Sequence, residues 1–367
     1  MDLKKLHQKY LRYSKESFLA DANIWVGTEA EKLSKKDLER IYDNYERKSF
    51  NHLFKKIKDI IYLKNLFDFS LIHSTENWVL LKLITFLEKE KVISVNKLGK
   101  IKVLEEELFN LMPKPLSVGE IKKRVEKKIG KKINLLEPTS KIFGTKILAE
   151  YDQMPISNSS AIFLVEKILK TIPFKKRFLF VGDDDMVSLF LCIADPGIEC
   201  LVTDIDTNLL KKISRIAKKY NLKITTQKVD IRKVKSLGGG FGGFLVNPSY
   251  NYEGVKKFVE FGVSQLGKEG GFAFVEIGDE SIGNRFLFLE EIFAKNNLII
   301  RELSVGNIFY PWTSVHGEDK VLIDRLSKFF DKDLIKSNPK LAASLWLFEY
   351  IPFKVKKPKK QSIYAYI

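Results

Sequence analysis

The apolar run Phe178–Val181 constrains the fold most, because it ends at Gly182 and is followed by Asp183, Asp184 and Asp185. A short strand that breaks at a glycine and leads into a helix is typical of the first turn of a doubly wound nucleotide-binding sheet. Such turns usually carry two or three glycines, which let the backbone approach a phosphate. Three carboxylates would instead repel a pyrophosphate and attract an amine. The turn therefore predicts a nucleoside-type cofactor and cationic chemistry.

A second interpretation of the three aspartates is structural. Acidic residues favour a helix N-terminus, where they accept hydrogen bonds from free backbone N–H groups. Capping explains one of the three well, a second less well and the third poorly, so both interpretations stay open for this turn.

Strand-like and helix-like segments alternate from the first strand to the C-terminus, which predicts an α/β fold with a mostly parallel sheet. The seven strands, with the last returning after a long insertion, predict a Rossmann-like sheet of the class I S-adenosylmethionine-enzyme type. The expected strands are Arg177–Val181, Cys200–Thr203, Lys223–Lys228, Gly243–Val246, Gly271–Ile277, Leu298–Leu303 and Leu345–Ile351.

The N-terminal part is expected to be helical, with a winged-helix-like domain after it. An amphipathic helix over 74–90 precedes a hairpin that turns near Gly99, and Ser117 with Glu120 forms a capping box for a helix that ends at Gly130. We predict a helical region at 1–65, a winged-helix-like domain at 66–135 and a catalytic domain at 136–367. A role in holding proteins together is favoured over DNA reading.

Composition limits the classes of site and partner. The 367 residues carry a net charge of +17, which fits either nucleic-acid binding or a thermophile surface about equally well. Only two cysteines and four scattered histidines are present, so we expect no disulfide framework and no metal site. No apolar run approaches the roughly 18 residues of a membrane span, and we expect a cytoplasmic protein.

Further acidic residues follow the second and third strands. Asp204 lies about twenty residues past the glycine turn, where a carboxylate accepts hydrogen bonds from a ribose diol. Asp206 is expected to cap the next helix, and capping by both aspartates is the alternative. Asp230 follows the third strand, where such folds contact the adenine amino group.

The fourth strand ends in Asn247-Pro248-Ser249-Tyr250. This sequence resembles the Asn/Asp-Pro-Pro-aromatic motif of enzymes that alkylate nitrogen. A rigid proline turn would direct the Asn oxygen and nearby carbonyls at the attacking amine, and the aromatic ring would pack against the substrate. The same tetrapeptide is also an ordinary turn.

Glu150, Asp152 and Glu276 add carboxylates at strand ends or just before the first strand. The carboxyl ends of parallel strands meet at one edge of a sheet, so most of these acids are expected to converge on one cleft. An acidic cleft in a strongly basic chain predicts a small polycationic substrate, and nucleic acid does not fit it.

Taken together, these motifs resemble the branched-chain polyamine synthases, a family of aminopropyltransferases. The resemblance rests on Val181-Gly-Asp-Asp-Asp185, Thr203-Asp-Ile-Asp206, Asp230 with Arg232, and the proline motif before Glu253-Gly254, over about 145–280. It implies that decarboxylated S-adenosylmethionine donates aminopropyl groups to the secondary amine of spermidine, and it implies a homodimer. The family usually has Asp-Pro-Pro-Tyr-Thr where this chain has Asn247-Pro-Ser-Tyr-Asn251, which shifts any general-base role toward Asp183–Asp185.

The expected roles follow from these motifs. Asp183, Asp184 and Asp185 bind ammonium groups, and one of them takes the proton of the attacking nitrogen. Asn247 and Tyr250 position the amine, with Glu150, Asp152 and Glu276 as further substrate contacts. Gly182, Asp204, Asp230 and Pro248 hold the co-substrate, and no metal is required.

Two competing functions stay open. An S-adenosylmethionine-dependent N-methyltransferase on RNA or DNA is the main alternative, and a non-catalytic DNA-binding regulator is the other. The insertion over 313–340 is expected either to cover the cleft or to be a solvated surface excursion.

Overall fold

The computed structural model describes residues 1–22, 27–46, 48–63, 77–144, 148, 151, 153–312 and 317–353. They divide into two compact units. Unit 1 is Met1–Met112 with the C-terminal residues from Pro352, and unit 2 is Pro113–Ile351. Among the described residues, no helix is both long and apolar enough to cross a bilayer.

Unit 1 is mostly helical. Its helices begin at capping side chains, such as Ser34 and Ser49, which accept hydrogen bonds from backbone N–H groups three residues later. Apolar residues at helical spacing form its core, with Phe54 and Ile57 of α4 and Phe86 of α6 essentially inaccessible. Its elements are α1 Leu3–Ala20, η1 Gly27–Lys32, α3 Lys35–Tyr45, α4 Phe50–Tyr62, α6 Asn77–Lys89, β1 Ile93–Val95, β2 Ile101–Val103 and α7 Glu107–Leu111.

The predicted hairpin is confirmed, but the winged-helix domain is not. β1 and β2 pair antiparallel, with Ile93 opposite Val103, and Gly99 turns at a φ of 71°. The capping box of Ser117 and Glu120 and the Gly130 C-cap are also confirmed, on helix α8 (Val118–Ile129). That helix belongs to unit 2. Its buried Ile121 and Val125 join the core of the large sheet, so the apolar face expected to complete a winged helix packs elsewhere.

Unit 2 contains a seven-stranded sheet in the order β5-β4-β3-β6-β7-β9-β8. β9 is antiparallel to both of its neighbours, and the strands from β5 to β7 are parallel. The expected α/β sheet, with a last strand that returns after an insertion, is therefore confirmed. The strands are β3 Phe178–Val181, β4 Cys200–Asp204, β5 Ile224–Lys228, β6 Gly243–Val246, β7 Gly271–Ile277, β8 Leu298–Tyr310 and β9 Leu341–Tyr350.

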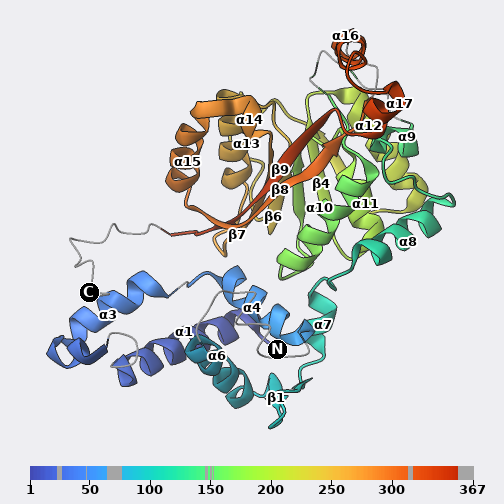
Figure 1. The fold of residues 1–367 in the computed structure, drawn as a ribbon. Coiled ribbons are helices and arrows are strands. Elements are labelled where there is room, and N and C mark those ends of the chain that lie inside the picture. Colours follow the sequence, from blue (N-terminus) through green and yellow to red (C-terminus); the bar gives the residue numbers. More distant parts are fainter. Residues whose placement is uncertain are drawn as a thin grey trace. The chain divides into compact units, whose positions relative to one another are not determined.

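Helices cover both faces of this sheet (Figure 1). One face packs against α8, α10 and α11, through residues such as Phe180, Ile162 and Phe190. The other packs against α13 and α15, through residues such as Val181 and Val259. The helices are α9 Thr139–Phe143, α10 Asn158–Thr171, α11 Val187–Ala194, α12 Thr207–Tyr220, α13 Tyr252–Ser264, α14 Asp279–Ile282, η3 Gly283–Arg285, α15 Phe286–Lys295, α16 Gly317–Leu326 and α17 Lys332–Ser337.

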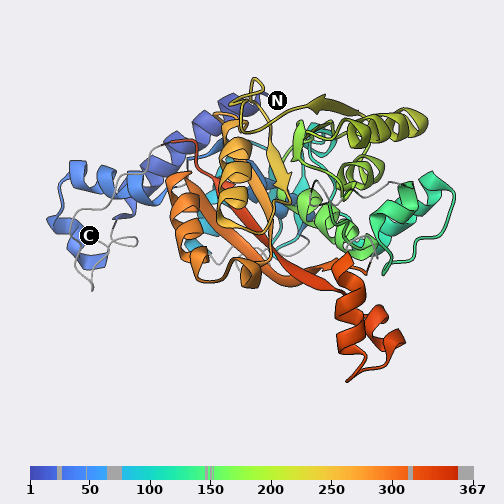
Figure 2. The same ribbon diagram turned by 90° about the horizontal axis from the view of Figure 1, so that it is seen from above.

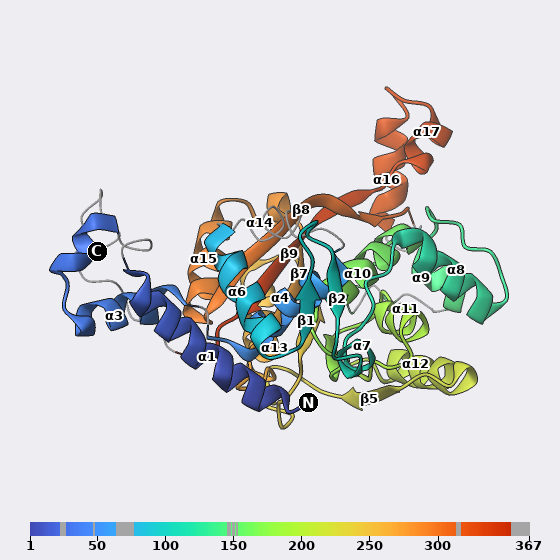
Figure 3. The same cartoon turned by 90° about the horizontal axis from the view of Figure 1, so that it is seen from below.

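β8 is longer than expected. The sequence predicts an end at Leu303, but the strand continues to Tyr310 across irregular pairing with β9. The helices α16 and α17 project beyond the ends of β8 and β9 (Figures 2 and 3). Whether this segment covers the cleft stays a prediction.

Candidate active site

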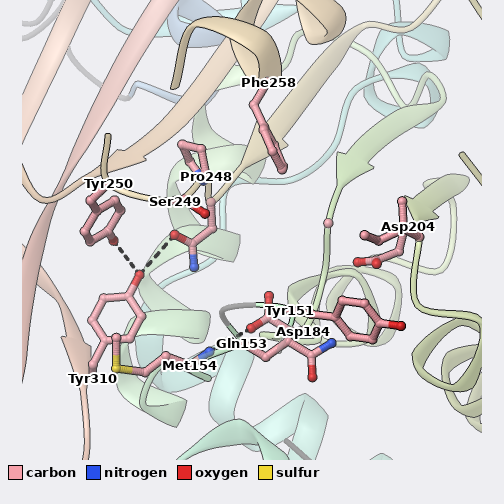
Figure 4. Close-up of a pocket in the computed structure, with 13 residues that line it drawn as sticks. Tyr151, Gln153, Met154, Asp184, Asp204, Pro248, Ser249, Tyr250, Phe258 and Tyr310 are labelled. Atoms are coloured by element: carbon pink, nitrogen blue, oxygen red, sulfur yellow. Dashed lines mark hydrogen bonds between the residues drawn. The ribbon is translucent and has the colours of Figure 1, made fainter. Parts of the chain in front are cut away.

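A cavity of about 250 Å³ lies at the carboxyl ends of β3, β4 and β6. Its described lining holds two carboxylates and no Lys, Arg or His side chain. Figure 4 shows Asp204 on one side and the Tyr250–Tyr310 pair on the other, with Asp184 between them. The lining residues are Tyr151, Gln153, Met154, Gly182, Asp184, Asp204, Ile205, Asn247, Pro248, Ser249, Tyr250, Phe258 and Tyr310.

Gly182 shapes the turn that follows β3. Its φ of +78° lies in the left-handed region, which an L side chain rarely adopts, and its N–H donates to the Thr203 carbonyl at 2.8 Å. A Cβ there would be in ordinary van der Waals contact with the Asp204 carboxylate, at 3.9 Å, so the positive φ and not crowding accounts for the glycine. The turn can therefore bring the Asp184 and Asp204 side chains to one cavity.

The three aspartates of the turn have different surroundings. Asp183 is buried and accepts hydrogen bonds from the Ser188 hydroxyl and N–H in the first turn of α11. Asp185 is also buried and accepts from the Ile156 N–H at 2.7 Å. Only Asp184 lines the cavity, and it accepts from the Met154 N–H at 3.1 Å.

Capping thus accounts for one aspartate, Asp183, in keeping with the expectation that it explains one of the three well. Asp183 serves the N-terminus of α11, whereas Asp184 and Asp185 accept hydrogen bonds from the segment before α10. The sequence does not predict that this segment bonds to the turn. Nothing in the residue types of Met154 or Ile156 marks them as partners of the turn.

A chain of hydrogen bonds runs from Asp185 through Asn247 and Tyr310 to Tyr250. The Asn247 Nδ2 donates to Asp185 at 2.8 Å, and the Tyr310 hydroxyl donates to the Asn247 Oδ1 at 3.1 Å. The Tyr310 and Tyr250 hydroxyls lie 2.6 Å apart. Both ends of the Asn247 amide are therefore engaged. The close position of Tyr250 requires Gly278, where a Cβ would come within 2.5 Å of the ring.

Glu276 lies on β7, fully buried and outside the cavity lining. Neither of its carboxylate oxygens has a hydrogen-bond partner among the described residues. Burial raises its pKa well above the usual value, and the Asp185 and Asp184 carboxylates raise it further. A buried acid with no counter-ion indicates a region that favours positive charge.

The cavity acids show the same trend. Burial raises the pKa of Asp185 to about 7 and that of Asp184 well above its usual range, and for Asp184 the Asp185 and Asp204 carboxylates add to it. Burial also raises the pKa of Asp204. Clustered carboxylates with raised pKa values can accept a proton near neutral pH.

Of two further acids, Asp206 has the predicted role and Asp230 lies away from the cavity. Asp206 caps α12, accepting from the Asn208 and Leu209 N–H groups, as predicted. Asp230 lies outside the lining and forms a bidentate ion pair with Arg232, at 2.8 and 2.9 Å. This pairing lowers the pKa of Asp230 to about 2. Its proposed contact with adenine stays a prediction, and Glu150 and Asp152 lie outside the described residues.

Several lining residues were missed by sequence reasoning. Tyr310 was missed because β8 was expected to end seven residues earlier, at Leu303. Ile205 and Phe258 carry no chemical signal, since apolar residues at such positions usually belong to a core. Gln153 and Tyr151 lie in a segment that the sequence marked only for its acidic residues.

Known proteins resemble the part of the chain that holds this cavity. Residues 145–322 match the family described as the branched-chain polyamine synthase A C-terminal domain. An uncharacterised protein of Methanocaldococcus jannaschii is 32% identical over 142 residues, which cover 38% of this chain and 36% of that protein. The N(4)-bis(aminopropyl)spermidine synthase of the same organism is 32% identical over 96 residues, which cover 25% of this chain and 27% of that protein.

Solved structures resemble the chain more distantly. The branched-chain polyamine synthase of Thermus thermophilus, in complex with N4-aminopropylspermidine and 5'-methylthioadenosine, is 15% identical with a TM-score of 0.47, and the match covers 90% of this chain and 97% of that one. A putative RNA methyltransferase from Pyrococcus horikoshii has a TM-score of 0.42 at 10% identity, covering 63% and 98%. The two curated relatives are matched over only 36% and 27% of their own lengths. Residues 145–322 thus match the branched-chain polyamine synthase family.

Proposed function

We propose that the protein is an aminopropyltransferase. It moves aminopropyl groups from decarboxylated S-adenosylmethionine to a secondary amine of spermidine or a related polyamine, and releases methylthioadenosine. The observation that carries the proposal is the cavity wall, which presents Asp184 and Asp204 and no described cationic side chain. The match of residues 145–322 to the branched-chain polyamine synthase family supports the same chemistry.

The charge of the donor fits this wall. S-adenosylmethionine carries a carboxylate that needs a cation or a set of N–H donors, and the described lining has no cationic side chain for it. The decarboxylated form carries an ammonium group and a sulfonium, both of which are stabilised by carboxylates. This contrast disfavours the methyltransferase alternative, although the fold alone would allow it.

In the proposed reaction, the neutral secondary amine attacks the carbon next to the sulfonium. The new N–C bond forms as the C–S bond breaks, and the sulfur leaves as the neutral thioether of methylthioadenosine. The amine must be neutral to attack, and it becomes cationic on alkylation. The alkylated nitrogen then loses its proton to a carboxylate, which acts as a general base. Asp184 is our candidate for this base, since it is the one aspartate of the turn that lines the cavity.

The other residues take supporting roles in this proposal. Asp204 accepts hydrogen bonds from the ribose, and Gly182 and Pro248 shape the co-substrate's pocket. Asp183 holds the start of α11. Asp185 orients Asn247, whose amide is fixed between Asp185 and Tyr310 and so positions the motif instead of acting as a base. Glu276 and Asp185 lie outside the cavity lining, and when they are ionised they add negative potential that favours a bound polycation. A homodimer and a cytoplasmic location stay predictions.

The test is incubation with decarboxylated S-adenosylmethionine and spermidine, followed by mass spectrometry. The expected products are methylthioadenosine and a branched polyamine, with tighter calorimetric binding of the decarboxylated donor than of S-adenosylmethionine. Absence of product with several linear polyamines, or the reverse order of donor affinity, would contradict the proposal.

A further inference from the structure

A second concave site in unit 2 has the opposite charge. A groove of about 520 Å³ lies between α12 and β5, the edge strand of the sheet. These two elements lie side by side (Figure 3). The groove shares no lining residue with the acidic cavity. It therefore requires an explanation of its own.

Four cations line the groove. Lys211, Arg215 and Lys218 stand at i, i+4 and i+7 on one face of α12, which spaces them over about 10 Å of helix axis. Lys228 comes from the end of β5. All four are exposed, and among the described residues none of them forms an ion pair. Their positive potential is thus not cancelled within the groove.

The remaining lining residues suit phosphate oxygens. Thr207, Ser214 and Thr226 add hydroxyl groups, which commonly donate hydrogen bonds to phosphates. No acidic and no aromatic side chain lines the groove among the described residues, so nothing there would stack on a base or read its edge. The site is built for the backbone of a polyanion and not for its sequence.

Two other anionic partners fit less well. An anionic membrane surface is usually met by cations together with exposed apolar side chains, but the one apolar lining residue, Leu210, is 5% exposed. A small phosphorylated ligand is usually held by converging backbone N–H groups at a glycine-rich turn. The cations here instead follow one helix face in a line, and that arrangement matches an extended chain of phosphates.

We propose that the groove between α12 and β5 binds the phosphodiester backbone of a nucleic acid. The chain's net charge of +17 would add long-range attraction to this contact. Binding there does not make the nucleic acid a substrate, because the groove is separate from the cavity. The proposal goes beyond the aminopropyltransferase function and does not depend on it.

The test compares two variants of the full chain that each lose four positive charges. The groove variant carries Lys211→Gln, Arg215→Gln, Lys218→Gln and Lys228→Gln. The control carries Lys123→Gln, Lys127→Gln, Lys128→Gln and Lys235→Gln, all of which are exposed in unit 2. Fluorescence anisotropy with labelled 20-nucleotide RNA, single-stranded DNA and duplex DNA is measured from 50 to 300 mM salt, without polyamine. Thermal unfolding checks that both variants fold.

We expect the wild type to bind the oligonucleotides with little sequence preference. Four phosphate contacts contribute about −3.6 to the slope of log K against log salt for duplex DNA, and about −2.8 for single strands. The groove variant should lose at least ~10-fold in affinity and most of this slope, and the control should lose no more than about 3-fold. A variant with Lys211→Arg, Lys218→Arg and Lys228→Arg keeps the charge and should keep the affinity.

Three results would overturn the proposal. Equal losses in the groove variant and the control would assign binding to net charge alone. An absence of oligonucleotide binding by the wild type at 50 mM salt would remove the site. Groove-dependent binding to vesicles containing phosphatidylserine, with none to oligonucleotides, would assign the groove to a lipid surface. Each readout is a binding constant measured without donor or amine, so failure here is independent of the aminopropyl transfer assay.

Discussion

Unit 1 contains a largely buried glutamate, Glu46, and unit 2 a fully buried one, Glu276, and the surroundings shift their pKa values in opposite directions. In unit 1, Glu46 accepts hydrogen bonds from the Lys82 ammonium and the Ser14 hydroxyl, each at 2.9 Å. Burial alone would raise its pKa, but the charge and hydrogen bond of Lys82, together with the Lys56 charge and the Ser14 hydroxyl, outweigh this, and the pKa of Glu46 is lowered. In unit 2, Glu276 has no such partner among the described residues, and its pKa is raised.

The difference separates an acid that is neutralised by its own chain from one that has no counter-charge among the described residues. A buried ion pair is complete within the chain, so removing one member leaves an uncompensated charge. An unpaired buried acid costs stability in the free protein, and this cost persists where function uses it. The acids of unit 2 are therefore expected to gain their counter-charge from a bound polycation.

Breaking the pair in unit 1 should have the largest effect. Lys82→Gln should destabilise unit 1 by about 3–5 kcal/mol at pH 7, because Glu46 would remain buried without its cation. With Lys82 present, the lowered pKa of Glu46 stabilises the fold above pH 4.5 and this contribution is lost as the pH falls. The loss in the variant should therefore shrink in acid. Chemical denaturation from pH 3 to 8 measures it.

The control for this change is Lys9→Gln. Lys9 pairs with Glu90 at the surface, and its side chain is half exposed. Its replacement should cost less than about 1 kcal/mol. If Lys82→Gln cost no more than this control, the contrast between the two units would fail.

Removing the charge of Asp184 should have the next largest effect. Asp184→Asn keeps the shape of the side chain but should lower turnover by ~10² or more, the usual size of a general-base contribution. Donor affinity should change much less, because Asp204 remains. Single-turnover kinetics and calorimetry separate the two effects.

Asp195→Asn is the matched control for Asp184. Asp195 is also buried, but it lies at the other end of α11, where it accepts from the Gly197 N–H at 2.9 Å. Near-full turnover in Asp184→Asn would mean that Asp184 has only a structural role, through its hydrogen bond from the Met154 N–H, and would contradict the proposed role of the unit 2 acids in catalysis.

Glu276→Gln tests the cost of the unpaired acid. The folded pKa of Glu276 lies above its unfolded value of 4.5, so its charge destabilises the fold increasingly as the pH rises above 4.5. The variant should therefore be more stable than the wild type at pH 8, by about 2 kcal/mol, and equal to it in acid. Turnover should fall at the same time. Thermal unfolding from acid to pH 8 shows whether the variant is more or less stable than the wild type.

Glu349→Gln provides the opposite case in the same sheet. Glu349 is buried and lies 3.7 Å from the Arg301 guanidinium, so its replacement should destabilise the fold at pH 8. If both variants were destabilised equally, Glu276 would be a paired structural acid like Glu46.

The smallest expected effect concerns Tyr310. Tyr310→Phe removes the hydroxyl that joins Asn247 to Tyr250 and should lower turnover by ~10-fold, with a stability loss of about 1 kcal/mol. Tyr220→Phe, on α12 and outside the cavity lining, should leave turnover within about 2-fold of the wild type. Equal turnover in the two variants would show that the hydrogen bonds of Tyr310 do not position the substrate.

Local patterns in the sequence determined much of the sheet and part of the site. The apolar runs of β6 and β7 gave the observed bounds, because a buried parallel strand reads as a continuous apolar segment. Their positions at strand ends predicted that Asp184, Asp204 and the Asn247 motif lie together, and all three line the cavity. Parallel strands bring their carboxyl ends to one edge, so sequence order alone makes this prediction.

Only the tertiary structure decided which of the three aspartates lines the cavity. The residues are chemically identical and adjacent, so no pattern separates them, whereas Ser188, Met154 and Ile156 fix their directions through hydrogen bonds across 5 to 30 positions. The same holds for Asp230, which its neighbour Arg232 holds in an ion pair outside the lining, and for Tyr310, which an irregular edge strand carries to the site. Sequence order specifies which residues share an edge of the sheet, and packing specifies the direction of each side chain.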